Sequence, residues 1–452
     1  MKIIIVGCGK IGTNIISELV KEGHDVVAID KSPAVLEEVT TIYDVMGVCG
    51  SGTDCETLEE SGVNEAELLI AVTDSDEMNM LSCFIAGRMG ASHTIARIRN
   101  PEYNDQSLGF MKEQLKLSMA INPELTAAKE LYRLLKLPSA AKVETFSGRN
   151  FEMVEIKLKA DSVLDGLSLI EFRKKYQMNI LICVVKRDKE VFIPDGNFVL
   201  KSGDRIGVTA KPAEIMKFFK MLGIQRKQAK NVMILGASKT AFYLAKMLLD
   251  GGSNVKIIDL DQNKCAAFSE GLPGAVLING DGARQELLLE EGIQNTDAFV
   301  TLTGMDEENI LISYYASSQG VPHVITKANR EEFVIMAEKL GLDCIITPKK
   351  LISDVMVSYA RGLHNSLGSK IETLYKLMDG KAELAEFIVQ SDCELNGIAF
   401  KDLNIKKSTR VAGIIRGRKI IIPTGNDCML AGDKVIAVTA AHGLSDLNDI
   451  VE

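Results

Sequence analysis

Short apolar runs alternate with amphipathic stretches through the opening part of the chain. The runs are IIIVG, DVVAID, LLIAVT and HTIARI, and residues 13–22 and 77–89 between them have helical spacing. Apolar runs of this length, separated by helical segments, are typical of parallel strands joined by crossover helices. The pattern therefore predicts an α/β domain with a Rossmann-like, doubly wound parallel sheet.

The same pattern returns in the second half of the chain. Gly7 and Gly236 each follow a short apolar run, and Asp30 and Asp259 follow them at the same interval. The segment GSGTDCETLEESGVNEAELLIAVTDSDEMNM also matches the later segment GDGARQELLLEEGIQNTDAFVTLTGMDEENI. Agreement over this length indicates an internal duplication. The aligned positions include Thr73 with Thr303, Asp76 with Asp306, Asn79 with Asn309 and His93 with His323.

A second, smaller unit also occurs twice. It reads GLSLIEFRKKYQMNILICVVKRDKEVFIPDGNFVLKSGDRIG from Gly166 and GIAFKDLNIKKSTRVAGIIRGRKIIIPTGNDCMLAGDKVI from Gly397. Both copies have an I-P-x-G turn followed by a Gly-Asp pair, which predicts short strands around tight turns. The first copy has a helical segment over residues 167–176. Each unit is therefore expected to be a small α+β domain.

The chain is thus expected to contain four domains in the order large, small, large, small. Helical spacing over residues 110–137, broken at Pro123, and over a second stretch from Ile345 predicts a helical arm after each large domain. An amphipathic face shows only that something covers it, so each arm is expected either to pack on its own domain or to cross to a partner. The predicted boundaries are 1–123 and 229–348 for the Rossmann-like domains, 124–148 and 349–379 for the arms or linkers, and 149–225 and 380–452 for the small domains.

The turn after the first apolar run has the sequence of a dinucleotide-binding turn. Gly7 allows the tight turn, Gly9 lets the backbone approach a diphosphate, and Gly12 allows close packing of helix on strand. The helix that starts here offers free N–H groups to phosphate, and Lys10 could reach the same group. A lone G-x-G-x-x-G is a weak signal, but here it follows a strand, opens a helix and precedes Asp30 at the end of the next strand. This context predicts a nucleotide site in the first Rossmann-like domain, the first lobe of the chain.

Asp30 is expected to accept hydrogen bonds from the ribose hydroxyls of an adenosine. Its charge opposes a 2′-phosphate and so favours NAD(H) over NADP(H), although the neighbouring Lys31 weakens this exclusion. Loops after the other strands should lie at the same edge, and Arg97 is expected to meet either a phosphate or a carboxylate. The candidate binding residues of the first lobe are Gly7, Cys8, Gly9, Lys10, Ile11, Gly12, Asp30, Lys31, Ser32, Gly52, Thr53, Asp54, Thr73, Asp74 and Arg97.

The second copy of the turn departs from this pattern. Ser238 replaces the second glycine and Ala241 replaces the third. A Cβ at position 238 crowds the place of a diphosphate, although the serine hydroxyl could bind one phosphate. The second lobe is therefore expected to bind a nucleotide weakly, to bind a different one, or to bind none. Its candidate residues are Gly236, Ser238, Lys239, Asp259, Thr303 and Lys327.

Composition narrows the classes of protein further. The 452 residues carry a formal net charge of -9 and no visible basic stripe, which argues against a nucleic-acid-binding protein. The nine cysteines form no C-x-x-C pair, so neither a zinc ribbon nor a redox dithiol is indicated, and no metal site is predicted. The first residues lack the features of a signal peptide, and no apolar stretch approaches the ~20 residues of a membrane span. We therefore expect an intracellular, soluble protein.

The sequence contains no recognisable catalytic constellation. A dehydrogenase needs an acid or base in its substrate domain, and the first small unit contains no histidine. Duplication of the whole unit is also unusual for a single-site enzyme, so nucleotide binding without chemistry is favoured, with an NAD-dependent oxidoreductase as the alternative. A cation-sensing module is a further alternative. It is the weaker one, because acidic side chains in this pattern are typical of solvated helix faces. That module would use Asp74, Asp76, Glu77 and the cluster Glu56, Glu59 and Glu60.

Beyond these separate motifs, the chain resembles a known family over essentially its whole length. The segments that carry the resemblance are GCGKIG, DKS, GSGTD, AVTDSDEMN, ARIRNPEY and, most specifically, INPELTAAKELYRLL. They resemble the TrkA family of tandem RCK-domain (KTN-domain) proteins, the cytosolic regulatory subunits of Trk/Ktr-type potassium transport. In that family, Rossmann-type RCK N-type domains alternate with small α+β RCK C-type domains.

The resemblance implies a regulator rather than an enzyme. It implies that the N-type lobes bind NAD or NADH, or adenine nucleotides such as ATP or ADP, and that the chain assembles as a dimer or tetramer ring. The ring would gate a membrane-embedded TrkH-type potassium channel subunit. The protein is accordingly expected in the cytoplasm, peripheral at the inner face of the cell membrane through its partner. Ser238 and Ala241 depart from the family pattern and leave nucleotide use by the second lobe open.

Overall fold

The computed structural model describes residues 1–100, 105–136, 142–146, 151–223, 229–342, 344–364, 369–440, 444 and 446–452. The P-E-Y of the ARIRNPEY segment and the predicted domain boundaries at residues 148, 149 and 225 lie outside the described residues. The chain forms two compact units. Unit 1 comprises residues 1–129 and 347–360, and unit 2 comprises residues 130–346 and 361–452.

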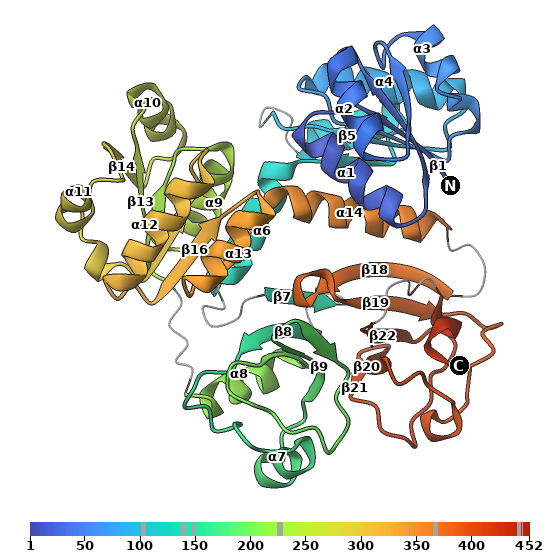
Figure 1. The fold of residues 1–452 in the computed structure, drawn as a ribbon, viewed down its shortest axis with the longest axis vertical. Helices are drawn as coiled ribbons and strands as arrows, with labels where there is room; N and C mark the ends of the chain where they lie inside the picture. The colour runs from blue at the N-terminus through green and yellow to red at the C-terminus, as the bar shows by residue number, and fades with distance from the viewer. Residues whose placement is uncertain are drawn as a thin grey trace. The chain divides into compact units, whose positions relative to one another are not determined.

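Unit 1 is built around a six-stranded parallel sheet in the order β3-β2-β1-β4-β5-β6. Figure 1 draws its strands in blue to cyan, with β1 and β5 labelled. The strand order reverses at β1, so the turn after β1 stands at the topological switch point, with β2 and β4 on opposite sides. The predicted Rossmann-like fold class is confirmed. The elements are β1 (Lys2–Val6), α1 (Lys10–Lys21), β2 (Asp25–Asp30), α2 (Pro33–Ile42), β3 (Met46–Cys49), α3 (Cys55–Glu60), η1 (Val63–Glu65), β4 (Leu68–Ala71), α4 (Asp76–Met89), β5 (His93–Arg97), α5 (Asp105–Gln114) and β6 (Met119–Ile121).

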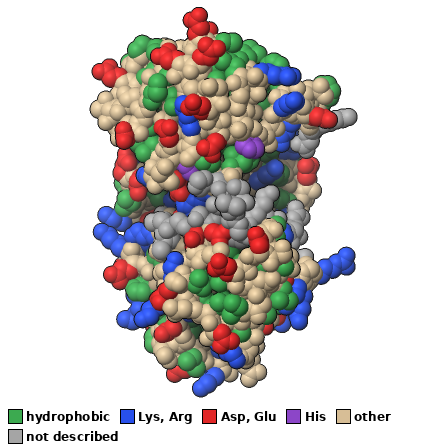
Figure 2. All heavy atoms as spheres, turned by 90° about the vertical axis from the view of Figure 1, so that its right-hand side faces the viewer, with side chains coloured by type: hydrophobic (Ala, Val, Ile, Leu, Met, Phe, Trp, Pro, Cys, Tyr) green, Lys and Arg blue, Asp and Glu red, His purple; other side chains and the backbone are tan. Residues whose placement is uncertain are grey.

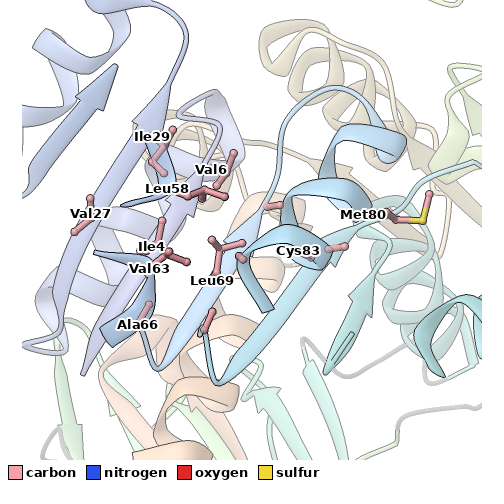
Figure 3. Packing of buried hydrophobic residues seen from close by; sticks show 14 of the residues in the cluster. Ile4, Val6, Val27, Ile29, Leu58, Val63, Ala66, Leu69, Met80 and Cys83 are labelled. Atoms are coloured by element: carbon pink, nitrogen blue, oxygen red, sulfur yellow. The ribbon is translucent and has the colours of Figure 1, made fainter. Parts of the chain in front are cut away.

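The central strands β1 and β4 are apolar on both faces because both of their faces are buried. Val6 of β1, Ile29 of β2 and Leu69 of β4 belong to one buried cluster, to which α4 adds Met80 and Cys83 (Figure 3). This packing holds the carboxyl ends of the three strands at one edge of the sheet. The loops that carry the candidate binding residues start from that edge.

Unit 2 contains a second parallel sheet with the same topology, in the order β14-β13-β12-β15-β16-β17. Its register also repeats, since Val232 pairs with Val255 as Ile3 pairs with Val26 in the first sheet. The duplication predicted from the sequence is therefore present in the fold. The elements are β12 (Asn231–Leu235), α9 (Lys239–Asp250), β13 (Asn254–Asp259), α10 (Gln262–Gly271), β14 (Ala275–Asn279), α11 (Gln285–Glu290), η3 (Ile293–Asn295), β15 (Ala298–Thr301), α12 (Asp306–Ser318), β16 (His323–Lys327), α13 (Glu331–Lys339) and β17 (Ile345–Ile346).

Unit 2 also contains two five-stranded antiparallel sheets, in the orders β10-β9-β11-β8-β7 and β18-β19-β22-β20-β21. They correspond to the two predicted small α+β units. The first comprises β7 (Lys142–Phe146), β8 (Phe151–Lys157), α7 (Leu169–Tyr176), β9 (Leu181–Arg187), β10 (Glu190–Phe192), β11 (Arg205–Ala210) and α8 (Pro212–Met221). The second comprises β18 (Ser369–Leu377), η4 (Met378–Gly380), β19 (Ala382–Val389), η5 (Phe400–Asp402), β20 (Thr409–Arg416), β21 (Lys419–Ile421), β22 (Lys434–Thr439) and η6 (Leu447–Ile450).

Strands β7 and β18 correct the predicted boundaries, because their residues had been assigned to the arms or linkers. β7 pairs with β8 and β18 pairs with β19, in each case antiparallel. Each strand is the chain neighbour of the strand with which it pairs, so a hairpin draws it into the sheet. The small domains therefore begin earlier in the chain than the sequence pattern suggested.

The two small sheets share one buried apolar cluster, in which Phe151 of β8 is fully buried. The Thr209 hydroxyl donates to the carbonyl oxygen of Ala412 at 3.1 Å. The backbone N–H of Met378 donates to the Glu155 carboxylate at 3.1 Å. One copy of the small domain thus covers the apolar face of the other, within the same chain.

The second arm, α14 (Pro348–His364), follows the second parallel sheet, yet its residues as far as Ala360 belong to unit 1. The Asn14 side chain of α1 donates to the Ser353 hydroxyl at 2.6 Å and to the Lys349 carbonyl oxygen at 3.4 Å. The sequence left open whether an arm packs on its own domain or crosses to a partner. Helix α14 does neither in this structure, because it packs on the first lobe of the same chain.

The first arm, α6 (Pro123–Lys136), is divided between the units, with its residues as far as Lys129 in unit 1 and those from Glu130 in unit 2. The Tyr132 hydroxyl lies 2.8 Å from the position that a Cβ on Gly251 would take, at the end of α9. Pro123 is the first residue of α6, in agreement with the predicted break in helical spacing. Neither arm, nor any other helix within the described ranges, is long and apolar enough to cross a membrane.

His323, at the start of β16, makes the stability of unit 2 depend on pH. The residue is 5 % exposed, and its Nδ1 has no hydrogen-bond partner among the described residues. Burial lowers the pKa of this imidazole from 6.5 to about 4. The unfolded chain therefore binds the proton at a higher pH than the folded chain. Stability is complete above about pH 6.5 and is lost as the pH falls toward 4, by up to about 3 kcal/mol.

Urea unfolding at about pH 7 and about pH 4.5 tests this dependence. The wild-type chain is expected to lose more stability between the two pH values than a His323→Leu variant, in which no group titrates at this position. Equal losses in the two proteins would contradict the assignment.

Candidate dinucleotide-binding site

The turn after β1 has the close approaches that its glycines predict. Gly7 has φ +94°, in the left-handed region, and a Cβ there would lie 2.9 Å from the Thr73 nitrogen. A Cβ on Gly12 would lie 1.9 Å from the Gly7 carbonyl oxygen, so only glycine lets α1 pack this closely on the turn. A Cβ on Gly9 would meet no atom within 4 Å, because Gly9 lines an open cleft.

Helix α1 presents an uncapped N-terminus at this cleft. Gly9 is the N-cap residue and has no side chain that could accept a hydrogen bond, and the first turn contains no acidic residue. The first N–H groups of a helix lack acceptors within the helix, and together with the helix dipole they favour an anion. Lys10, the first residue of α1, is exposed and adds a positive charge at the same end.

Asp30 joins the end of β2 to the glycine turn. Its Oδ2 accepts a hydrogen bond from the Cys8 N–H at 2.7 Å, and its Oδ1 accepts one from the Ser32 N–H at 2.9 Å. A carboxylate has about four acceptor sites, so Asp30, which lines the cleft, can accept further hydrogen bonds from a ligand. It stands where the sequence predicted a ribose acceptor.

Cys8 contributes its backbone rather than its thiol. Its side chain is buried and does not line the cleft. Burial, and after it the charge of Asp30, raises the pKa of the Cys8 thiol to about 12. A thiol with this pKa stays protonated near neutral pH and is neither a nucleophile nor a redox-active thiolate.

The cleft has a volume of about 370 Å³. Of the candidate residues, the cleft is lined by Gly7, Gly9, Asp30, Lys31, Gly52, Thr73 and Asp74. The lining also includes residues absent from the candidate set, namely Val6, Ile29, Val35, Gly50, Ser51, Val72, Ser75, Met78 and Ser82. Val6 and Val72 immediately precede the turns after β1 and β4, and this strand-end position was the available signal for them. Met78 and Ser82 lie on α4, and the sequence pattern of this helix does not distinguish side chains that line the cleft from side chains in the core.

The remaining candidates of the first lobe stand outside the lining. They are Cys8, Lys10, Ile11, Gly12, Ser32, Thr53, Asp54 and Arg97. Asp54 caps α3, since its Oδ2 accepts from the Thr57 N–H at 2.9 Å and from the Thr57 hydroxyl at 2.7 Å. These bonds, led by the one from the hydroxyl, lower the pKa of the Asp54 carboxyl. Asp54 therefore supports the loop that follows Gly50 and Gly52.

Asn79 shapes the loop at the end of β4 from inside. It is fully buried, and its Oδ1 accepts from the N–H and the hydroxyl of Thr73 at 2.8 and 2.7 Å. Its Nδ2 donates to the carbonyl oxygen of Arg97 at 2.9 Å. The side chain thus connects the ends of β4 and β5, and it positions Thr73 without facing a ligand.

Arg97, at the end of β5, is 4 % exposed. Its Nη2 donates to the carbonyl oxygen of Thr73 and to Asp74 Oδ1, the latter at 3.2 Å. Burial is the main cause that lowers the pKa of the guanidinium, which nevertheless remains charged. Of the two partners predicted for Arg97, the structure provides the carboxylate.

The second lobe has the same plan with a closed turn. Ser238 is the N-cap of α9, and its hydroxyl accepts from the Ala241 N–H at 3.3 Å. Asp259 Oδ2 accepts from the Ala237 N–H at 2.6 Å, as Asp30 accepts from Cys8. Lys327 donates to the Thr303 carbonyl oxygen at 2.9 Å, as Arg97 donates to Thr73. The helix that could meet a phosphate is thus capped by the chain itself.

Two acidic residues of the alternative cation-sensing module, Asp76 and Glu77, are engaged in the fold, whereas Glu56, Glu59 and Glu60 are exposed. Asp76 Oδ2 accepts from the N–H groups of Arg99 and Asn100, both at 2.8 Å. Glu77 Oε2 accepts from the Ser75 hydroxyl at 2.7 Å. Across the described residues, no group of three or more His, Cys, Asp and Glu side chains is arranged to hold a metal ion.

Solved structures of RCK domains share this fold. The GsuK RCK domain covers 97% of this chain and 92% of its own, with a TM-score of 0.64 and 16% sequence identity. The GsuK channel bound to NAD gives the same TM-score over 97% of this chain and 76% of its own, also at 16% identity. The fold and the cleft together define a protein with a tandem RCK fold, whose first lobe is a Rossmann domain with an open glycine turn.

Family models and relatives identify the family. The TrkA-N domain matches residues 3–123 and 232–348, and the TrkA-C domain matches residues 153–223 and 384–451. A Trk system potassium uptake protein TrkA homolog of Archaeoglobus fulgidus is 31% identical over 450 residues, which cover 100% of both chains. The Trk system potassium uptake protein TrkA of Haemophilus influenzae is 28% identical over 458 residues, with 100% of this chain and 97% of the relative covered. The chain belongs to the TrkA family.

Proposed function

We propose that the chain is the nucleotide-binding regulatory subunit that gates a TrkH-type potassium uptake channel in response to NAD(H) or adenine nucleotides. The observation that carries the proposal is the open cleft at the switch point, where an uncapped helix N-terminus and Asp30 face a shared volume. The names of the TrkA relatives and the NAD-bound GsuK channel of similar fold support the same conclusion.

The ligand would lie across β1, from the β2 side to the β4 side. Its adenosine would place the ribose hydroxyls on Asp30, beside the loop of Gly50 and Gly52. Its diphosphate would lie against Gly9 and the N-terminus of α1, where charge-assisted hydrogen bonds from N–H groups are strong. Binding of NAD or NADH would by itself change the free energy of the lobe, so no hydride transfer is required.

Helix α14 offers a route from this site to the small domains. Asn14, on the helix that starts at the glycine turn, bonds to Ser353 of α14 in unit 1. Arg361, near the other end of α14, forms a buried bidentate ion pair with Glu383 of β19 in unit 2, at 2.9 and 3.0 Å. A ligand that fits one arrangement of these parts better than another would shift the population of arrangements. A tenfold shift needs only about 1.4 kcal/mol.

Assembly into a dimer or tetramer ring would use apolar side chains on the second lobe. Leu311 and Tyr314 of α12 are 63% and 50% exposed, and Ile335 of α13 is 48% exposed. Leu81, the counterpart of Leu311 on α4 of the first lobe, is 47% exposed as well. Lys and Arg side chains mix with Asp and Glu on the face shown in Figure 2, with apolar side chains between them. Apolar helix faces that are exposed in both repeats favour contacts between copies of the chain.

A Leu311→Asp, Tyr314→Ser double variant is therefore expected to have a lower assembled mass than the wild-type protein in light scattering. The aspartate introduced by Leu311→Asp would have to lose its hydration in the contact between copies of the chain, which costs free energy. Leu289→Asp on α11 is a matched control, because Leu289 is 45% exposed but lies on a different helix. An unchanged mass in the double variant would contradict this position for the interface.

The proposed function is tested by calorimetric titration of the full chain with NADH and with ATP, followed by co-purification with the membrane partner. Tight NADH binding, retention of a TrkH-type membrane protein and no NADH oxidation across a panel of small substrates are expected. Steady NADH turnover would instead support the oxidoreductase alternative. Failure to bind any nucleotide would overturn the regulatory proposal. The partner would also account for a position at the inner face of the cell membrane.

A further inference from the structure

Asp74 places a carboxylate at the end of the cleft that lies away from Asp30. Asp30 follows β2 and Asp74 follows β4, on opposite sides of β1. Both residues line the cleft, and the side chain of Asp74 is fully exposed. A ligand whose adenosine ribose sits on Asp30 must therefore extend toward Asp74.

The positive charges near Asp74 are already paired. Arg97 holds Asp74 Oδ1 at 3.2 Å from a side chain that is only 5% exposed. Arg99 donates to the Asp74 carbonyl oxygen at 2.7 Å, and its guanidinium lies 3.9 Å from the carboxylates of Asp76 and Glu124. These two cations face three carboxylates. The group that a ligand meets at this end is thus the exposed acid rather than an arginine.

A dinucleotide and a triphosphate would meet this acid in opposite ways. The diphosphate of either ligand would occupy the turn at Gly9. Beyond it, NAD(H) continues with a neutral ribose, whose hydroxyls can donate to a carboxylate. ATP continues with its terminal phosphate, and two anions would stand close together at a cost in affinity. We infer that Asp74 determines ligand specificity and makes the first lobe select NAD(H) over ATP.

The second lobe supplies the matched substitution, because Gly304 follows Thr303 as Asp74 follows Thr73. The inference rests on the proposed function, since it concerns the same cleft. Its test is competitive calorimetry on the full chain with NADH, ADP and ATP, in buffer with a chelator so that no cation masks the phosphates. The proteins compared are the wild type, Asp74→Asn and Asp74→Gly, with thermal melting as a check on folding.

The wild type is expected to bind NADH about tenfold or more tightly than ATP. In both variants the ratio of NADH affinity to ATP affinity should fall by about tenfold, mainly because ATP binds more tightly. The affinity for ADP should change less than that for ATP, because ADP lacks the terminal phosphate. If the variants fold and bind with the wild-type ratio of NADH to ATP affinity, the inference is overturned while the proposed function stands. If the wild type binds no nucleotide, both are overturned.

Discussion

Replacing Gly9 with serine is expected to abolish NADH binding while leaving the chain as stable as before or slightly more stable. The change copies Ser238 of the second lobe into the first. Gly9 and Ser238 both have extended backbone, with φ -70° and -92°, so serine fits position 9 without strain. As a cap it would favour the helix by only a few tenths of a kcal/mol over glycine.

The loss of binding follows from two effects of the new hydroxymethyl group. The side chain would occupy the cleft beside the diphosphate position, and its oxygen would accept the N–H of Gly12 as Ser238 accepts that of Ala241. Loss of two charge-assisted hydrogen bonds, each worth about 1.5–3 kcal/mol, corresponds to a reduction in affinity of at least about 100-fold. Calorimetry and thermal melting measure the two outcomes. Ser238→Ala is the control and should leave NADH binding unchanged, whereas a Gly9→Ser chain that still binds NADH tightly would refute the phosphate assignment.

Asp30→Asn is expected to weaken NADH binding by about 10- to 100-fold, since a neutral amide replaces the charged acceptor of the ribose hydroxyls. The same change removes the charge that opposes a 2′-phosphate, so the affinity for NADPH relative to NADH should rise. Parallel titrations with the two coenzymes measure both effects.

Asp259→Asn provides a closely matched control for this experiment. Asp30 and Asp259 each accept two backbone N–H groups, one in the glycine turn and one two residues further along the chain. Both variants therefore lose a comparable structural bond, and the difference between them isolates the role toward the ligand. Equal NADH affinities in the two variants would remove Asp30 from the site.

The duplicated fold could be predicted because local signals agree with one another along the chain. Apolar runs, glycine turns and the acids after them recur in the same order, and each needs only its neighbours in sequence to be recognised. The same holds for Gly7 and Gly12, whose close contacts arise within the β1–α1 connection itself.

The direction of individual side chains could not be predicted in this way. Cys8 lies between two glycines of the binding turn, yet its thiol is buried, and only its N–H reaches Asp30. Arg97 ends a strand at the ligand edge, yet it is buried against Thr73 and Asp74. Both outcomes depend on packing between elements, which a linear pattern does not encode.

Contacts between residues that are far apart in the sequence could not be predicted either. Helix α14 has the amphipathic spacing of an arm, but that spacing does not reveal that Ser353 bonds to Asn14 in the first lobe. This long-range bond joins the helix that starts at the glycine turn to α14, and the regulatory proposal depends on it.

Diffraction from crystals grown with NADH would show whether the coenzyme binds at the glycine turn of the first lobe. We expect one coenzyme per chain, with its phosphate oxygens against the N–H groups at the start of α1 and its adenosine sugar on Asp30. Coenzyme density confined to the second lobe, or a first-lobe cleft that stays empty at saturating NADH, would contradict this expectation.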